Sequence, residues 1–225
     1  MATNISDSSR SFRKVPRNKV LLICGIFSAV LYVLTDLLAS WWYDGYRIID
    51  QNYSELLATG APTRPAMLLV SVVYNLLVIA FAIGIWTSDN QKRTSKITGA
   101  LMVGYAILSM VTPSFFQMDM RGAQITPLGS LHPLMTGVMS LFILLSMGFG
   151  AFLLSKRFRL YSFITIILLL VFGFITGLQA PQLTAGEPTP FMGFTERINI
   201  YATMIWFAVL SITLLRTEKR KISLN

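Results

Sequence analysis

Six long apolar stretches, separated by short polar segments, occupy nearly the whole of this 225-residue chain. They lie at about residues 20–42, 65–86, 97–111, 129–154, 160–179 and 194–215. A helix needs about 20 apolar residues to cross the roughly 30 Å hydrocarbon core of a bilayer. The pattern therefore predicts an all-α polytopic membrane protein with six transmembrane helices over residues 20–216, between a flexible basic tail at 1–19 and a basic tail at 217–225.

The composition excludes a large soluble part. Hydrophobic residues make up 54% of the chain and charged residues 13%, which is about half the charged fraction of an ordinary soluble domain. Six spans and short connectors use up nearly all the residues. We therefore expect one compact helix bundle and no separate soluble domain.

The basic residues are distributed unevenly between the two sides of the predicted bundle. Fifteen of the nineteen Lys and Arg residues fall in the two tails and in the connectors around Lys92 and Lys156, with three acids beside them. The other connectors and their helix ends carry four Arg and seven acids. This positive-inside pattern predicts both termini in the cytoplasm and a protein of the cell membrane.

The net charge of +9 suggests membrane lipids rather than nucleic acid as partners. The basic side should attract anionic headgroups. Nucleic-acid binding would need a folded basic surface, and the cations here lie in tails and short connectors. The oligomeric state is not indicated.

Cysteine and histidine are too few for the usual metal and cofactor sites. Cys24 and His132 are the single residues of their types. A disulfide within one chain, a zinc site built from Cys and His, and bis-histidine haem ligation are therefore excluded. The sequence contains no P-loop and no dinucleotide-binding fingerprint. We expect no metal and no cofactor.

Ionisable residues gather near the predicted outer helix ends. Asp36 lies five residues inside Trp41, which corresponds to about 8 Å of depth in a helix. A lone carboxylate at that depth is costly, so it should face the bundle, be protonated or pair with a cation. The other members of this group are Glu55, Arg64, Asp119, Arg121, His132, Glu196 and Arg197. If they converge, they line an outward-facing polar cavity; otherwise they mark helix ends in the headgroup region.

Three functions fit such a cavity. The leading hypothesis is binding of a lipid or small amphiphile, with arginines holding an anionic headgroup and apolar helices holding the tail. The second is a lipid-modifying enzyme that uses His132, Asp119 and Glu196 for acid–base chemistry. The third is a proton-coupled carrier with Asp36 as the proton site, although the inner halves of the spans lack charged residues. A sealed plug, in which Glu196 pairs with Arg64 and Arg121 pairs with Asp119, would instead make the group structural.

Several short motifs occur in an order that resembles a known family. They are YSELLATGAPTRP at 53–65, FFQMDMRGA at 115–123, LH at 131–132 and GFTERI at 193–198. Together they resemble the domain-of-unknown-function family 998, whose members are six-span prokaryotic membrane proteins, over most of the chain. The resemblance implies recurrent polar positions at Ser54, Glu55, Pro62, Arg64, Asp119, His132, Glu196 and Arg197. It implies the topology and the site but no reaction.

Overall fold

The computed structural model describes residues 17–88 and 93–224, and every regular element in that part of the chain is a helix. The α-helices are α1 (Arg17–Trp42), α2 (Arg64–Trp86), α3 (Arg93–Phe115), α4 (His132–Gly150), α5 (Lys156–Gly177), α6 (Ala180–Thr184) and α7 (Met192–Leu224); the 3₁₀ helices are η1 (Tyr53–Leu57) and η2 (Gly129–Leu131). Helices α1 to α5 and α7 are long and apolar enough to cross a membrane. The predicted all-α architecture with six transmembrane helices is confirmed for the described residues.

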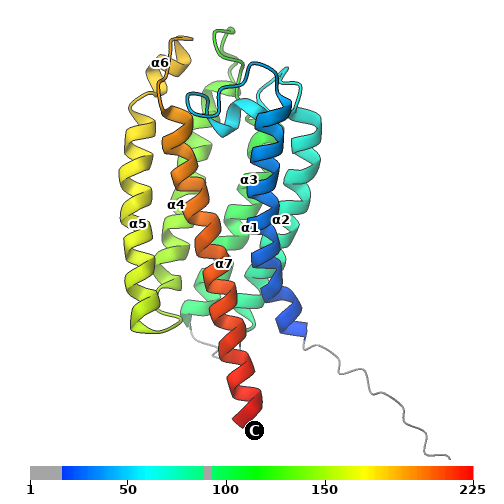
Figure 1. Ribbon diagram of the computed structural model, residues 1–225, viewed down its shortest axis with the longest axis vertical. Helices are drawn as coiled ribbons and strands as arrows, with labels where there is room; N and C mark the ends of the chain where they lie inside the picture. The colour runs from blue at the N-terminus through cyan, green and yellow to red at the C-terminus, as the bar shows by residue number, and fades with distance from the viewer. Residues whose placement is uncertain (1–16, 89–92, 225) are drawn as a thin grey trace, which may run out of the picture.

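The six long helices form a closed ring. Sequence neighbours pack together from α1 to α5, and α7 packs against both α5 and α1. Figure 1 shows α6 and the longer loops at one end of the bundle, which we call the loop end, and the C-terminal end of α7 at the other. The loop end carries residues 43–63, 116–128 and 178–191. Which side of the membrane it faces remains a prediction from the charge distribution.

The ring is filled by large side chains that α7 directs inward. Trp206, Phe207 and Leu210 are fully buried, and they meet Phe81 from α2 and Met102 from α3. The indole N–H of Trp206 donates to the hydroxyl of Ser162 on α5, at 3.0 Å. This bond satisfies a polar group that has no water available inside a membrane.

Several helix boundaries differ from the sequence prediction, among them the end of the third span and the end of α7, which continues to Leu224. Pro113 does not end the third span, because α3 continues through it to Phe115. A proline in the last turn removes one backbone donor, and the next turn still closes through Phe116 N–H and the Thr112 carbonyl, at 2.8 Å. The segment after α5 also contains the short helix α6, which the sequence analysis did not expect.

The two predicted tails fall partly outside the described residues. Of the segment 1–19, residues 17–19 are described, and they form the start of α1. The segment 217–224 continues α7 as helix. Near this end the Asn18 amide donates to Glu218, so the first and last spans are tied together.

Close packing of α2 against α3 generates a prediction about Gly99. A Cβ atom added at Gly99 would lie 2.8 Å from the Ala82 carbonyl oxygen, whereas one added at Gly148 on α4 would meet nothing within 4 Å. Gly99→Ala should therefore destabilise the protein by about 1–3 kcal/mol through overpacking. Gly148→Ala, the matched control, should leave stability unchanged or raise it by about 0.5–1 kcal/mol. Thermal unfolding in detergent measures both, and equal behaviour of the two variants would contradict the helix contact.

Candidate functional site

The loops at the loop end are joined to one another by backbone hydrogen bonds. Thr59 N–H donates to the Met118 carbonyl at 2.9 Å, which connects the segment 43–63 to the segment 116–128. Phe194 N–H donates to the Ile49 carbonyl at 2.9 Å, which connects the first loop to the start of α7. The loops therefore form one folded layer over this end of the bundle.

Asp36 on α1 and Arg197 on α7 form a buried ion pair under this layer. The Asp36 side chain is fully buried and the Arg197 side chain is 6% exposed. The guanidinium approaches the carboxylate through two nitrogens, with Nε–Oδ2 at 3.0 Å and Nη2–Oδ1 at 2.9 Å. This two-point geometry is the strong form of an arginine–carboxylate contact.

The remaining groups of the pair are bonded as well. Arg197 Nη1 donates to the carbonyls of Ile48 at 2.9 Å and Gln51 at 3.0 Å. Its Nη2 donates to the Tyr46 hydroxyl at 2.8 Å, and Asp36 Oδ2 accepts from the Tyr201 hydroxyl at 2.7 Å. The pair thus joins α1 and α7 to the first loop. Burial raises the pKa of the Tyr46 phenol above its ordinary value despite the opposing effect of Arg197, so the hydroxyl stays protonated.

Gly193 allows α7 to approach the first loop this closely. A Cβ atom at this position would lie 2.1 Å from the Gln51 carbonyl oxygen and 2.5 Å from that of Ile48. These are the two carbonyls that accept from Arg197. A side chain at 193 would push the loop away and leave the guanidinium without two of its acceptors.

Arg121 and Glu55 form a second ion pair, which ties three loops together. Arg121 Nη2 and Nε lie 2.8 Å and 3.2 Å from the two Glu55 oxygens. Arg121 also donates to the Glu187 carbonyl at 2.8 Å and to the Thr189 hydroxyl at 2.9 Å. Glu55 itself is fixed by a capping box with Asn52 at the start of η1.

Glu196 enters the bundle without a cationic partner. It accepts a hydrogen bond from the backbone N–H of Tyr53. Its position on α7 aligns with Ile200, Met204 and Phe207, which belong to the core, so the carboxylate faces inward. In the described residues no Lys, Arg or His nitrogen forms an ion pair with it.

The other predicted site residues bind local partners. Arg64 donates to the carbonyls of Leu57 and Pro113. Asp119 accepts from the backbone N–H of Thr126 at 2.8 Å, and His132 Nδ1 lies 2.8 Å from the Phe116 carbonyl.

Among the described residues no hydrogen bond joins His132 to a carboxylate, and no three His, Cys, Asp or Glu side chains are placed to hold a metal ion. The structure brings together Asp36 with Arg197 and Glu55 with Arg121. It does not bring Asp119, His132 and Glu196 into mutual contact.

An apolar groove of about 460 Å³ borders this network, between α1 and α7. It is lined by Leu37, Ile48, Ile49, Phe194, Arg197, Ile198, Tyr201, Ala202 and Ile205. Neither the groove nor the tyrosines that hydrogen-bond to the buried pair were predicted from the sequence. Helical spacing could have indicated Ser40 and Tyr201, because each lies four residues from a member of that pair.

The buried pair generates a stability prediction with an exposed pair as its control. Arg197→Gln leaves the Asp36 carboxylate buried without its cation and should cost about 3–5 kcal/mol. Arg47→Gln removes the partner of Asp50, but the Arg47 side chain is 78% exposed, so we expect a loss of about 0–1 kcal/mol. Thermal unfolding of the two variants in detergent checks this. A similar loss for both would mean that the Asp36–Arg197 contact does not stabilise the bundle.

Comparison with known proteins agrees with the resemblance found in the sequence. The family profile described as "Protein of unknown function (DUF998)" matches residues 26–213. No curated protein and no solved structure matches the chain. The family match begins within α1 and ends within α7. The chain therefore belongs to the DUF998 family of proteins of unknown function.

Proposed function

We propose that the protein binds a lipid or small amphiphile at the loop end, with the apolar tail in the groove between α1 and α7. The groove itself carries this proposal. Its volume of about 460 Å³ is in the range of small-molecule sites. Leu37, Phe194 and Ile205 in its walls are about half exposed, and in a membrane span such side chains face hydrocarbon. An acyl chain is the occupant that suits this surface.

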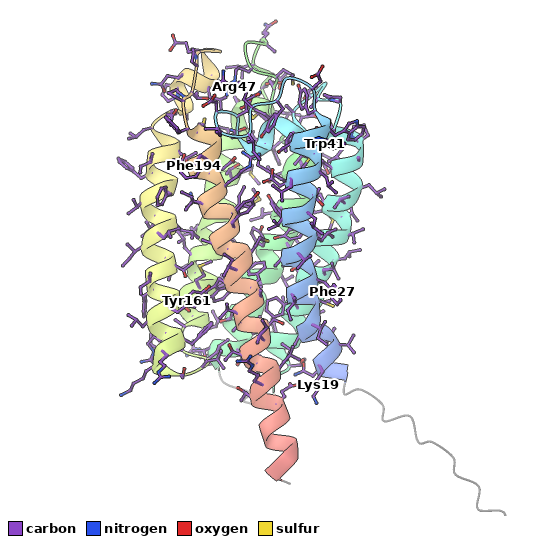
Figure 2. All side chains as sticks on the ribbon, viewed as in Figure 1. Lys19, Phe27, Trp41, Arg47, Tyr161 and Phe194 are labelled. Carbon is purple, nitrogen blue, oxygen red and sulfur yellow. The ribbon has the colours of Figure 1, made fainter. Side chains whose placement is uncertain are left out.

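The polar end of the ligand is expected near Arg47. The groups of Arg197 and Arg121 already donate to protein acceptors, so these arginines are not free to hold a headgroup. Arg47 precedes Ile48 of the groove, and its ion pair with Asp50 at 2.6 Å is exposed. Figure 2 places Arg47 and Phe194 at the same end of the bundle. An exposed pair is weak, so a lipid phosphate can compete with Asp50 for the guanidinium.

No specific observation favours the two alternative functions. An enzyme with a carboxylate–histidine set would need His132 beside an acid, and its Nδ1 instead meets the Phe116 carbonyl. For a carrier, Asp36 was the expected proton site, but both of its carboxylate oxygens accept hydrogen bonds from Arg197. Lipid binding therefore stays the leading proposal.

Filling the groove tests the tail site. Ala202→Phe places an aromatic ring in the groove and should lower the amount of co-purifying lipid severalfold. Ala66→Phe makes the same change at an exposed position on α2, outside the groove lining, and should leave retention unchanged. Native mass spectrometry of the purified proteins measures the bound lipid. Equal retention by wild type and both variants would exclude the groove as the binding site.

Removing the exposed arginine tests the headgroup site. Arg47→Gln should selectively reduce retention of anionic lipid, because a charge-assisted contact to phosphate is lost. Neutral lipids, held by the groove walls, should be retained as before. Native mass spectrometry after incubation with a defined mixture of phosphatidylglycerol and diacylglycerol gives the ratio. An unchanged ratio would remove Arg47 from the proposal while leaving the tail site standing.

A further inference from the structure

Four tyrosines from four elements meet inside the bundle, and we call them the tyrosine cluster: Tyr32, Tyr53, Tyr74 and Tyr105. The ring of Tyr32 on α1 stacks on Tyr53 of η1 at a centroid distance of 4.8 Å and meets Tyr74 of α2 edge-on at 4.9 Å. The hydroxyls of Tyr74 and Tyr105 lie 3.0 Å apart. Aromatic rings and phenol oxygens are thus gathered at one place, where the spanning helices α1, α2 and α3 meet the loop helix η1.

This cluster is not tightly filled. Tyr32 lies about one turn from Ala29 and Asp36, and Tyr105 lies within one turn of Met102 and Ala106. All four of these neighbours are buried, so both tyrosines occupy inward positions. Even so, Tyr32, Tyr53 and Tyr105 retain accessible surface, and only Tyr74 of the four is buried. Space the size of a water molecule therefore adjoins part of each of these three residues.

The charges beside the cluster do not balance. Glu196 accepts a hydrogen bond from the backbone N–H of Tyr53, and it forms no ion pair with a described residue. Arg197 follows it in the sequence, and Glu55 lies two residues after Tyr53. Arg197 is paired with Asp36, and Glu55 is paired with Arg121. When it is ionised, Glu196 is therefore a negative charge without an ion-pair partner among the described residues. A carboxylate facing a membrane interior requires a compensating positive charge or a proton.

We propose that Glu196 and the tyrosine cluster form a binding site for a small organic ammonium ion. The carboxylate would supply the charge, and the tyrosine rings would supply the aromatic surface on which ammonium groups bind. Hydrated Ca²⁺ and Mg²⁺ need several oxygen ligands with carboxylates among them, and the described residues provide one free carboxylate here. None of these five residues lines the α1–α7 groove, so the site is independent of the lipid proposal.

Choline and its neutral carbon isostere, dimethylbutanol, are the probes that test this site. The purified full chain is placed in phosphatidylglycerol nanodiscs, and binding is measured by isothermal titration and by the shift in unfolding temperature. Choline should bind and raise the unfolding temperature, because a ligand of the native state stabilises it. Dimethylbutanol should do neither. Equal effects of the two probes, or no effect of choline, would overturn the proposal.

Matched acid variants assign the binding to Glu196. Glu196→Gln keeps an acceptor for Tyr53 N–H but removes the charge, and it should weaken choline binding by at least about tenfold. Glu187→Gln removes an exposed acid of the outer loop and should change nothing. If Glu196→Gln is more stable than wild type and binds choline equally, the carboxylate holds a proton and no ammonium site exists.

A second lipid distinguishes a free ammonium from a lipid headgroup. In phosphatidylcholine nanodiscs the wild-type protein should bind added choline as it does in phosphatidylglycerol if the ligand is a free molecule. A raised basal stability of the wild type that Glu196→Gln abolishes, together with no binding of added choline by the wild type, would identify the headgroup as the source. Either result supports the ammonium site, and the absence of both contradicts it.

Discussion

The buried contact between Asp36 and Arg197 sets the arrangement of the whole loop end. Neither group is tolerated alone in hydrocarbon, so α1 and α7 must present them to each other. The guanidinium has further N–H donors, and these donate hydrogen bonds to the carbonyls of Ile48 and Gln51. The first loop is therefore fixed to α7 by the same side chain that joins the two helices. Because removing one partner leaves the other uncompensated, the pair specifies this geometry more than it adds stability.

The helices were predictable because bilayer thickness imposes a length on every apolar run. The six spans follow from that constraint alone. Their ends do not, as Pro113 within α3 and the continuation of α7 to Leu224 show. Near a helix end the loss of one hydrogen bond costs little free energy. The hydrogen-bond partners available to the last backbone groups therefore decide where the helix stops. The 3₁₀ helix η1 depends on the reciprocal bonds of Asn52 and Glu55, a spacing that the sequence does contain.

The candidate site was predictable as a set of residues but not as a set of contacts. Burial cost indicated that Asp36 needed a partner, and both Asp36 and Arg197 were among the expected residues. The choice of partner depends on how α1 and α7 are rotated, which their apolar runs do not encode. The plug considered from the sequence joined Glu196 to Arg64 and Arg121 to Asp119. In the structure Arg64 and Asp119 instead bind backbone groups, because loop carbonyls and amides compete for charged side chains.

Two adjacent residues of α7 hold the first loop through different contacts. Arg197 faces the groove and bonds the carbonyls of Ile48 and Gln51, while Glu196 faces the core and accepts from the Tyr53 backbone. The segment 48–53 is therefore common to the groove wall and to the tyrosine cluster. Gly193 makes this arrangement possible, because α7 touches the loop directly where any side chain would separate them.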